Sequence, residues 1–447
     1  MKIYFRGILF LLAALLPPFP SWGKTTGVEN GFGKAGSIKI VIALPTEGSY
    51  SFFSRQFING LLLSLGKQAG GRKINYIIKN LPISAGNKSI GKMFSSLAKK
   101  KVSAVIGPIF EGQLKYFAYN SAMFKIPVIT PSPVVSGKDF SPYVFNYGMT
   151  LKQEIKTEIE YAKYADLSSV AVIYPDYGYG LKLLHYIVKF SKKYGINISD
   201  TTAYSEKTVD FFYNFNSIVK FKNTAAAHNI SKKEAELGVT KYNMMHGITK
   251  LKPIIPFGGL FVIGGPSKLG LILTQLMYYN ITGFPIFGLS PFDSESFIEK
   301  YGFYMRNAIF TDGFFKHDDN RTVKAFAAAY KKNYGEMPNI LSAEGYDIGG
   351  IVIKAAERIN LSYNKDIDAV SVKSPYIYVF PQKRKEQPQK RLFAGGAEGL
   401  IFYRALLRVR RFKGVCGESR LSVNTFKKNL YLFKYKNNQV YILETPF

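Results

Sequence analysis

Histidine and cysteine, the side chains that most often bind zinc, are scarce in this chain. The four histidines are scattered, at His185, His228, His246 and His317. None has a cysteine or glutamate nearby at the spacing of metal ligands. The run His317-Asp318-Asp319 comes nearest to a cluster, but it precedes a predicted helix, where capping is the more natural role. We therefore expect neither a metal site nor a cofactor.

Motifs of nucleophilic and nucleotide-binding enzymes are also missing. The sequence has no G-x-S-x-G on a strand, no G-x-x-x-x-G-K-[ST] loop and no G-x-G-x-x-G after a strand. The glycines of GGPSKLG, residues 264–270, instead favour a strand-to-helix turn, whose free amides can bind a carboxylate. An enzyme that uses two carboxylates stays as a third hypothesis, because acidic residues at any separation can meet in a fold. We predict a binding protein, with no catalytic residue assigned.

The N-terminus is typical of an exported protein. Lys2 and Arg6 precede an apolar run from Ile8 to Leu16, and prolines and small residues follow it. This order predicts a signal peptide over residues 1–23. No later apolar stretch approaches the roughly 20 residues of a membrane-spanning helix. The one cysteine, Cys416, is far from the position of a lipid anchor, and we expect it to be packed. The mature protein is thus expected to be soluble, in the periplasm or otherwise exported.

The net charge of +30 favours anionic partners such as envelope polymers or acidic ligands. Export makes nucleic acid the least favoured of these, and we expect none. The positive charges are mostly lysines spread along the chain, together with many Asn, Ile, Tyr and Phe residues. This spread indicates a general compositional bias more than a dedicated basic site.

Strand-like and helix-like segments alternate along the chain. Continuous apolar runs, which suit parallel strands buried on both faces, occur at residues 38–44, 102–106, 170–174 and 260–263. Three segments have apolar residues at helical spacing, and a glycine ends each of them. They are Leu181, Leu184, Ile187 and Val188 before Gly195; Leu269, Ile272, Leu273 and Leu276 before Gly283; and Val323, Phe326, Ala327 and Tyr330 before Gly335. The fold class is therefore predicted as α/β with doubly wound parallel sheets, in which ligands bind beyond the carboxyl ends of the strands.

Two polar, Lys-rich stretches interrupt this alternation. The first covers residues 223–256 and the second about 371–396, which contains PQKRKEQPQKR. Both are interpreted as surface insertions.

Several segments, taken in order, resemble the type 1 periplasmic binding protein family, which includes branched-chain amino-acid receptors of ABC transporters. The matching segments are IKIVIALPTEGSYSFFSRQFING, VSAVIGP, KIPVITPSP, PDYGYG, FAAAYKKNYG, AEGYDIG and FKGVCGESRL. The resemblance implies two doubly wound lobes joined by three crossings, which we place near Gly148, His317 and Lys413. Lobe 1 is then 37–147 plus 318–412, and lobe 2 is 148–317 plus 413–447.

The resemblance also implies a ligand site between the lobes. The corresponding positions are Phe110, Glu111, Gly112, Gln113, Ser132, Pro133, Val134, Tyr177 and Asp312. Tyr177 would either stack on a ligand or pack its own turn against its lobe. Asp312 would pair with a ligand ammonium or cap the following turn, and Ser132 would donate its hydroxyl or form a proline-flanked turn. One departure stands out: a glutamate replaces the Ser- or Gly-rich loop that binds the carboxylate of amino acids in this family.

Two functions follow from the resemblance. The first is a solute-binding protein that closes over a small polar, amino-acid-like ligand for the permease of an ABC transporter. The alternative is an envelope interaction module similar to activators of penicillin-binding proteins, with a cell-wall synthase or an anionic envelope polymer as its partner. The missing lipidation cysteine argues against the alternative.

Overall fold

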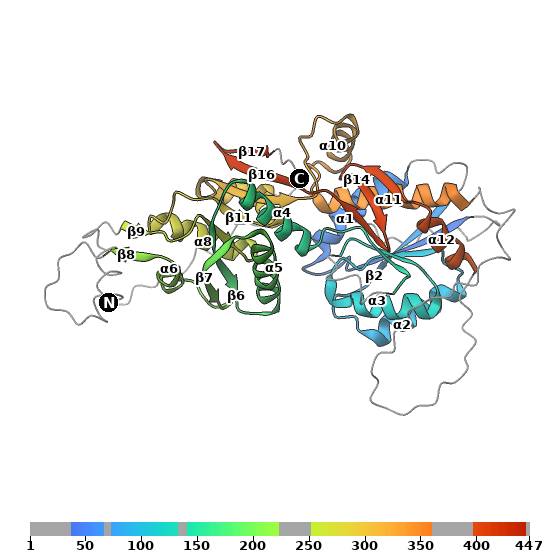
Figure 1. The fold of residues 1–447 in the computed structure, drawn as a ribbon. Helices are drawn as coiled ribbons and strands as arrows, with labels where there is room; N and C mark the ends of the chain where they lie inside the picture. The colour runs from blue at the N-terminus through green and yellow to red at the C-terminus, as the bar shows by residue number, and fades with distance from the viewer. Residues whose placement is uncertain (1–36, 67–72, 133–140, 223–251, 360–396, 444–447) are drawn as a thin grey trace, which may run out of the picture.

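The computed structural model describes residues 37–66, 73–132, 141–222, 252–359 and 397–443. These residues form two α/β lobes, each built on one mainly parallel sheet with helices on both faces (Figure 1). The predicted fold class is confirmed. The predicted signal peptide, the stretch 223–251 and the stretch 371–396 lie outside the described residues.

The sheet of lobe 1 has eight strands in the order β13-β14-β15-β5-β4-β3-β1-β2. Its strands are β1 (Ile38–Leu44), β2 (Ile74–Asn80), β3 (Ala104–Ile106), β4 (Val128–Thr130), β5 (Val144–Asn146), β13 (Arg411–Gly414), β14 (Gly417–Ser422) and β15 (Thr425–Lys428). Its helices are α1 (Ser51–Leu65), α2 (Asn87–Lys99), α3 (Glu111–Phe124), α10 (Arg321–Tyr334), α11 (Ile340–Ile359) and α12 (Ala397–Leu407).

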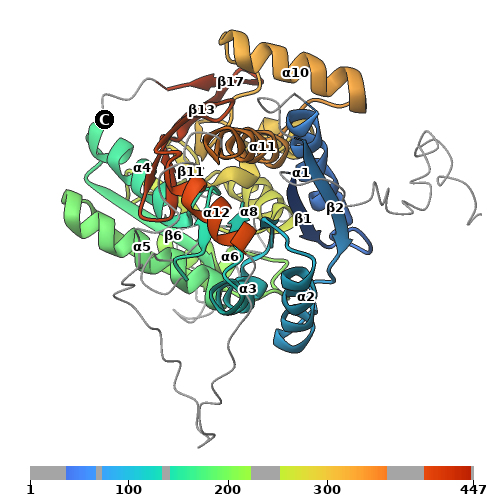
Figure 2. The same cartoon turned by 90° about the vertical axis from the view of Figure 1, so that its right-hand side faces the viewer.

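Alternation along β1 explains why both faces of this sheet are covered. Ile40 and Ile42 point into the core formed with α1, α11 and α12, whereas Val41 and Ala43 point into the core formed with α2 and α3. Figure 2 shows α1 and α11 on one side of the strands and α2 and α3 on the other. A strand buried on both faces reads as a continuous apolar run, and IKIVIAL is such a run.

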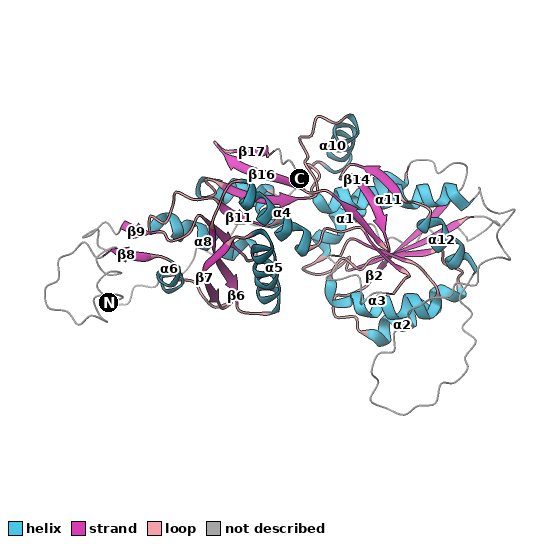
Figure 3. Ribbon diagram, viewed as in Figure 1, coloured by secondary structure: helices cyan, strands magenta, loops and turns pink. Residues whose placement is uncertain are grey.

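Lobe 2 repeats this plan with seven strands in the order β17-β16-β12-β11-β10-β6-β7 (Figure 3). Its strands are β6 (Ser169–Pro175), β7 (Asn197–Tyr204), β10 (Gly259–Val262), β11 (Ile286–Gly288), β12 (Ala308–Asp312), β16 (Tyr431–Lys436) and β17 (Gln439–Ile442). Its helices are α4 (Leu151–Tyr164), α5 (Gly178–Tyr194), α6 (Phe212–Ile218), α8 (Pro266–Tyr278), η1 (Ser290–Asp293), α9 (Glu295–Tyr301) and η2 (Gly302–Tyr304). A separate antiparallel pair joins β8 (Lys220–Lys222) to β9 (Lys252–Ile254), so the end of the first expected insertion is a strand.

The predicted helices are present, with one error in the buried face. In α8 and α10 all the apolar positions named from the sequence are buried, and the Asn320 side chain caps α10. In α5, however, Leu181 and Val188 are exposed, whereas Leu183 and Phe190 are buried with Ile187. The buried face of α5 is therefore turned away from the predicted one, because the helix packs on α4 as well as on the sheet.

The chain passes between the lobes three times. The first passage lies between β5 and α4, and the second lies at Gly313, where Phe314 joins the core of lobe 1 and Phe315 contacts Phe433 of lobe 2. The third lies between β15 and β16, not near Lys413 as expected. The reason is that β13 and β14 form a hairpin-like extension with β15, which pairs with β5 at the edge of the first sheet. Residues 413–428 thus belong to lobe 1.

Candidate ligand site

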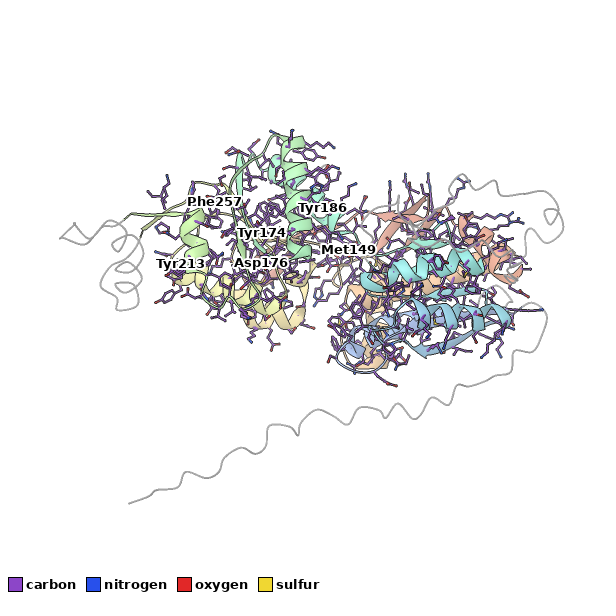
Figure 4. All side chains as sticks on the ribbon, turned by 90° about the horizontal axis from the view of Figure 1, so that it is seen from below. Met149, Tyr174, Asp176, Tyr186, Tyr213 and Phe257 are labelled. Atoms are coloured by element: carbon purple, nitrogen blue, oxygen red, sulfur yellow. The ribbon has the colours of Figure 1, made fainter. Side chains whose placement is uncertain are left out.

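The carboxyl edges of the two parallel sheets face each other across the molecule. Glu111 begins α3 just after β3 of lobe 1, and Lys182 lies in the first turns of α5, just after β6 of lobe 2. The Lys182 Nζ donates to Oε1 and Oε2 of Glu111 at 3.1 and 3.3 Å. Figure 4 shows Met149 where the lobes meet and Tyr186 of α5 on the side of lobe 2 toward lobe 1. We call these two edges, with the loops that follow their strands, the facing edges.

Hydrogen bonds join the ends of β3 and β4 at the facing edge of lobe 1. Gly107 and Pro108 are joined by a cis peptide bond, and Gly107 has a φ of 125°. A Cβ at Gly107 would come within 2.5 Å of the Ala43 carbonyl oxygen, so only glycine fits here. The Thr130 hydroxyl donates to the Pro108 carbonyl at 2.7 Å and accepts from the Ser132 amide at 3.0 Å. Pro108 after β3 and Ser132 after β4 are therefore held in a fixed relative position.

The four expected positions that follow the segment VSAVIGP, Phe110 to Gln113, have different environments. Phe110 and Gly112 lie at the start of α3, and Glu111 makes the ion pair across the facing edges. The Gln113 side chain is buried, and its amide donates to the Pro82 carbonyl at 2.8 Å. Gln113 thus ties α3 to the loop after β2 within lobe 1, which is a structural role.

Ser132 lies at the carboxyl end of β4, as expected. Its side chain is fully buried, and its hydroxyl has no hydrogen-bond partner among the described residues. The Asn146 amide donates to the Ser132 carbonyl at 2.7 Å and fixes this turn from β5. Pro133 and Val134 lie outside the described residues.

The facing edge of lobe 1 also carries aromatic residues that were not expected there. The Phe110 ring contacts Tyr50 and Phe53, with ring centroids 5.2 and 6.2 Å apart and edge-to-face geometry. Both partners come from the loop and first turn between β1 and α1. The signal in the sequence was the run YSFF, which by itself is equally typical of a helix that buries its aromatic residues.

Tyr177 occupies the matching position on lobe 2, at the start of α5. Its side chain is 42% exposed, and its ring stacks on Tyr179 at 6.5 Å between centroids. Partial burial, with Glu206 and then Asp176 nearby, raises the pKa of Tyr177, so its hydroxyl stays protonated. The ring is thus free to contact a ligand, while its turn is already supported by Tyr179.

Asp312 is buried at the carboxyl end of β12 and does not reach outward. Its Oδ1 accepts the amides of Gly313 and Phe314, so it caps the turn of the second passage. Burial and the neighbouring Asp293 and Glu154 raise the pKa of Asp312 well above its usual range. This geometry agrees with the capping role that was one of its two predicted roles, and not with the pairing of a ligand ammonium.

Two further glutamates of α4 lie buried beside Asp312. Glu154 accepts the Ser290 amide at 3.0 Å, and burial raises its pKa to about 7. Glu158 accepts the Thr311 hydroxyl at 3.3 Å, and burial, with Glu154 nearby, raises its pKa well above the usual value. These carboxyl groups hold α4 to the ends of β11 and β12, close to the first passage between the lobes.

The passages between the lobes meet at the buried carboxylate of Glu344 on α11. Its Oε1 accepts the Met149 amide of the first passage at 3.2 Å and the Lys428 Nζ next to the third passage at 2.8 Å. Met149 in turn packs against Gly313 of the second passage. Beside them, Asp347 accepts the Tyr147 hydroxyl at 2.7 Å and the amides of Val415 and Cys416. We call this group, with the passages that it holds, the junction.

A family model described as a periplasmic binding protein matches residues 37–439. The chain belongs to the periplasmic binding protein family. The match covers both lobes and the junction of this periplasmic binding protein, and it confirms the resemblance inferred from the ordered segments. A comparison with curated proteins by sequence finds no significant match.

Solved structures show the same fold for this periplasmic binding protein. The branched-chain amino-acid transporter binding protein LivJ of Streptococcus pneumoniae, in complex with isoleucine, matches with a TM-score of 0.61 and 19% identity, over 91% of this chain and 99% of its own. A solute-binding protein of an ABC transporter from Rhodopseudomonas palustris, in complex with 3,4-dihydroxybenzoic acid, matches with a TM-score of 0.62 and 16% identity, over 92% and 97%. A substrate-binding protein of an ABC transporter from Sphaerobacter thermophilus matches with a TM-score of 0.67 and 15% identity, over 92% and 97%.

Other kinds of site have little support in the part of the chain that the structure describes. Its His, Cys, Asp and Glu residues form no group of three that would hold a metal ion. None of its helices combines the length and the apolar character needed to span a membrane. A cavity of about 260 Å³ lies on lobe 2 beside the start of β11 and the residues before β12, at the opposite edge of the sheet from Tyr177. That cavity is separate from the facing edges.

Proposed function

We propose that this chain is an exported solute-binding protein that closes its facing edges over a small ligand and delivers it to the permease of an ABC transporter. One observation carries the proposal: the ion pair between Glu111 and Lys182 joins the carboxyl edges of two doubly wound lobes. Ligands of doubly wound folds bind beyond that edge of the sheet. A ligand that contacts both lobes at once favours the closed arrangement by differential binding.

The ligand site of this proposal is narrower than the one expected from the sequence. It comprises the loops after β3 and β4, with Phe110 and Ser132, and Tyr177 on lobe 2. Gln113 and Asp312 are left out, because both side chains are buried and the Gln113 amide nitrogen and Asp312 Oδ1 already bind backbone groups. Glu111 is assigned to one side of this site, where its ion pair with Lys182 joins the two lobes.

The proposed role is binding without catalysis, in the periplasm. The family and the similar solved structures are binding proteins, several of them described as parts of ABC transporters. The same descriptions disfavour an envelope interaction module as the function. Permease, compartment and absence of catalysis are inferred together from this family membership.

A thermal-shift screen of the mature chain, from Lys24 onward, tests the proposal. The panel contains amino acids, short peptides, amides, aliphatic and aromatic carboxylates, amines and cell-wall fragments. A ligand at 100 times its dissociation constant should add about 2.7 kcal/mol to the free energy of unfolding, which shifts the melting temperature visibly. A shift with one class of small molecule supports a solute receptor. No shift across the whole panel, or a shift with cell-wall fragments alone, contradicts it.

A further inference from the structure

Two aromatic side chains at the facing edge of lobe 1 are open to solvent. Tyr50 and Phe53 are 43% and 42% exposed, although both lie in ring contact with Phe110. Large aromatic side chains are mostly buried in folded proteins, and a contiguous exposed group of them marks a binding surface. Its place at the carboxyl edge of lobe 1 puts this surface inside the proposed ligand site.

The positions of these rings are not explained by helix formation. Tyr50, Phe110 and Tyr177 are the N-cap residues of α1, α3 and α5, and none makes a side-chain cap. Ser, Thr, Asp and Asn are favoured at this position, and their loss typically removes about 1 kcal/mol of helix stability. The chain does use such caps elsewhere, with Thr150 at α4 and Asn320 at α10. The rings at the facing edges therefore do not stabilise the helices that they begin by capping them.

Rings of both lobes lie close in the chain to the ion pair that joins the lobes. Phe110 directly precedes Glu111, whose carboxylate contacts Lys182 of α5. Tyr177 begins that same helix and is exposed. A planar ligand between the lobes would thus meet Tyr50, Phe53 and Phe110 on one side and Tyr177 on the other. Ring pairs in stacked or edge-to-face contact are worth about 0.5–1.5 kcal/mol beyond their buried area.

Asp312, the carboxylate that the family resemblance offered to a ligand ammonium, is already in use, and so is Glu111 at the facing edges. Glu111 is paired with Lys182, and Asp312 accepts two amides of its own turn. An amino acid would therefore find neither of them free to pair with its ammonium. The aromatic rings of the described facing edges remain available for contact with a ligand.

We propose that the ligand of this receptor carries an aromatic ring, which lies against Tyr50, Phe53 and Phe110 of lobe 1 and Tyr177 of lobe 2. The inference rests on the proposed function, since it assigns a chemical class to the solute of the same site. The compounds of the titration below distinguish a carboxylate, an amine and an amino acid as the polar end of the ligand.

Calorimetric titration of the mature chain with pairs of matched compounds tests this inference. The pairs share a polar end and differ in the ring: phenylacetate and cyclohexylacetate, benzylamine and cyclohexylmethylamine, phenylalanine and leucine. We expect at least one aromatic compound to bind, and its aliphatic counterpart to bind roughly tenfold more weakly. Aliphatic compounds that bind as tightly as their aromatic counterparts overturn the inference but leave a solute receptor in place. A panel with no binder also overturns it, and the function itself fails only if the broader thermal-shift screen is negative too.

Variants on lobe 1 locate the ring. Phe53→Ala should weaken binding of the aromatic compound roughly tenfold without lowering the melting temperature, because the side chain is half exposed. Tyr119→Ala is the matched control, since Tyr119 of α3 has the same exposed fraction, 42%, but lies beyond the first turns of its helix. Equal affinities of the two variants would place the ring elsewhere and contradict the assignment.

Discussion

The junction buries bonded polar groups, whereas the facing edges expose aromatic rings. At the junction, Glu344, Asp347 and Lys428 are buried, and each is bonded to a partner. At the facing edges, three helices begin with aromatic residues that provide no cap, and rings are exposed. Contacts within the chain thus hold the passages between the lobes in place. The rings at the facing edges instead stay partly exposed, as expected if a ligand covers them.

The largest effect is expected from breaking the ion pair of the junction. Lys428→Met leaves the Glu344 carboxylate buried without its partner, which should lower the free energy of unfolding by roughly 3–5 kcal/mol. Urea unfolding followed by circular dichroism measures this change. Lys427→Met is the control, because Lys427 is the exposed neighbour on the same strand. Similar losses in both variants would mean that the pair does not hold the junction.

A second prediction concerns the pH dependence of stability near the first passage. The pKa of Glu154 is raised to about 7 in the folded chain, so the folded state binds its proton more tightly than the unfolded state does. This contribution to stability is therefore present at low pH and is lost as pH rises through about 7. Glu154→Gln should lie within about 1 kcal/mol of the wild type at pH 5 and exceed it at pH 8, by at most about 3 kcal/mol. A difference between the two proteins that is the same at pH 5 and pH 8 would contradict a neutral Glu154.

The smallest effect is expected at the facing edges themselves. Glu111→Gln removes an exposed ion pair between the lobes, and such pairs contribute about 0–1 kcal/mol and weaken in salt. The variant should bind ligand slightly more weakly than the wild type at low salt and equally at high salt, as measured by calorimetry. Glu418→Gln breaks an exposed pair within lobe 1 and serves as the control. A large loss with Glu111→Gln that persists in salt would mean that Glu111 contacts the ligand directly.

The sequence could predict the lobes because their strands are buried on both faces. IKIVIAL and VAVIY read as continuous apolar runs, and the apolar residues named over 269–276 and 323–330 are buried in α8 and α10. The third passage was misplaced because β13 to β15 are edge strands, whose alternating exposure carries no mark of which sheet they join. Leu181 and Val188 of α5 were misjudged because a spacing of residues does not say which neighbouring element a face meets.

The sequence indicated some of the residues that we propose for the ligand site. The resemblance indicated Phe110, Ser132 and Tyr177, which lie at the facing edges. It could not show that Gln113 turns toward the Pro82 carbonyl, since that bond depends on packing between distant segments. Tyr50 and Phe53 were missed because exposed and buried aromatic residues look alike in a helix-start pattern.

The central claim is that the facing edges close over a ligand, and a cross-linking experiment tests it most directly. Glu111→Cys and Lys182→Cys, combined in one chain, place a thiol on each lobe where the ion pair now lies, and the natural Cys416 is buried. The account predicts that a short bis-maleimide links the two thiols faster when the ligand found in the screen is bound, and that the linked protein releases this ligand slowly. Linking at the same rate with and without ligand, together with unchanged release, would contradict closure at these edges.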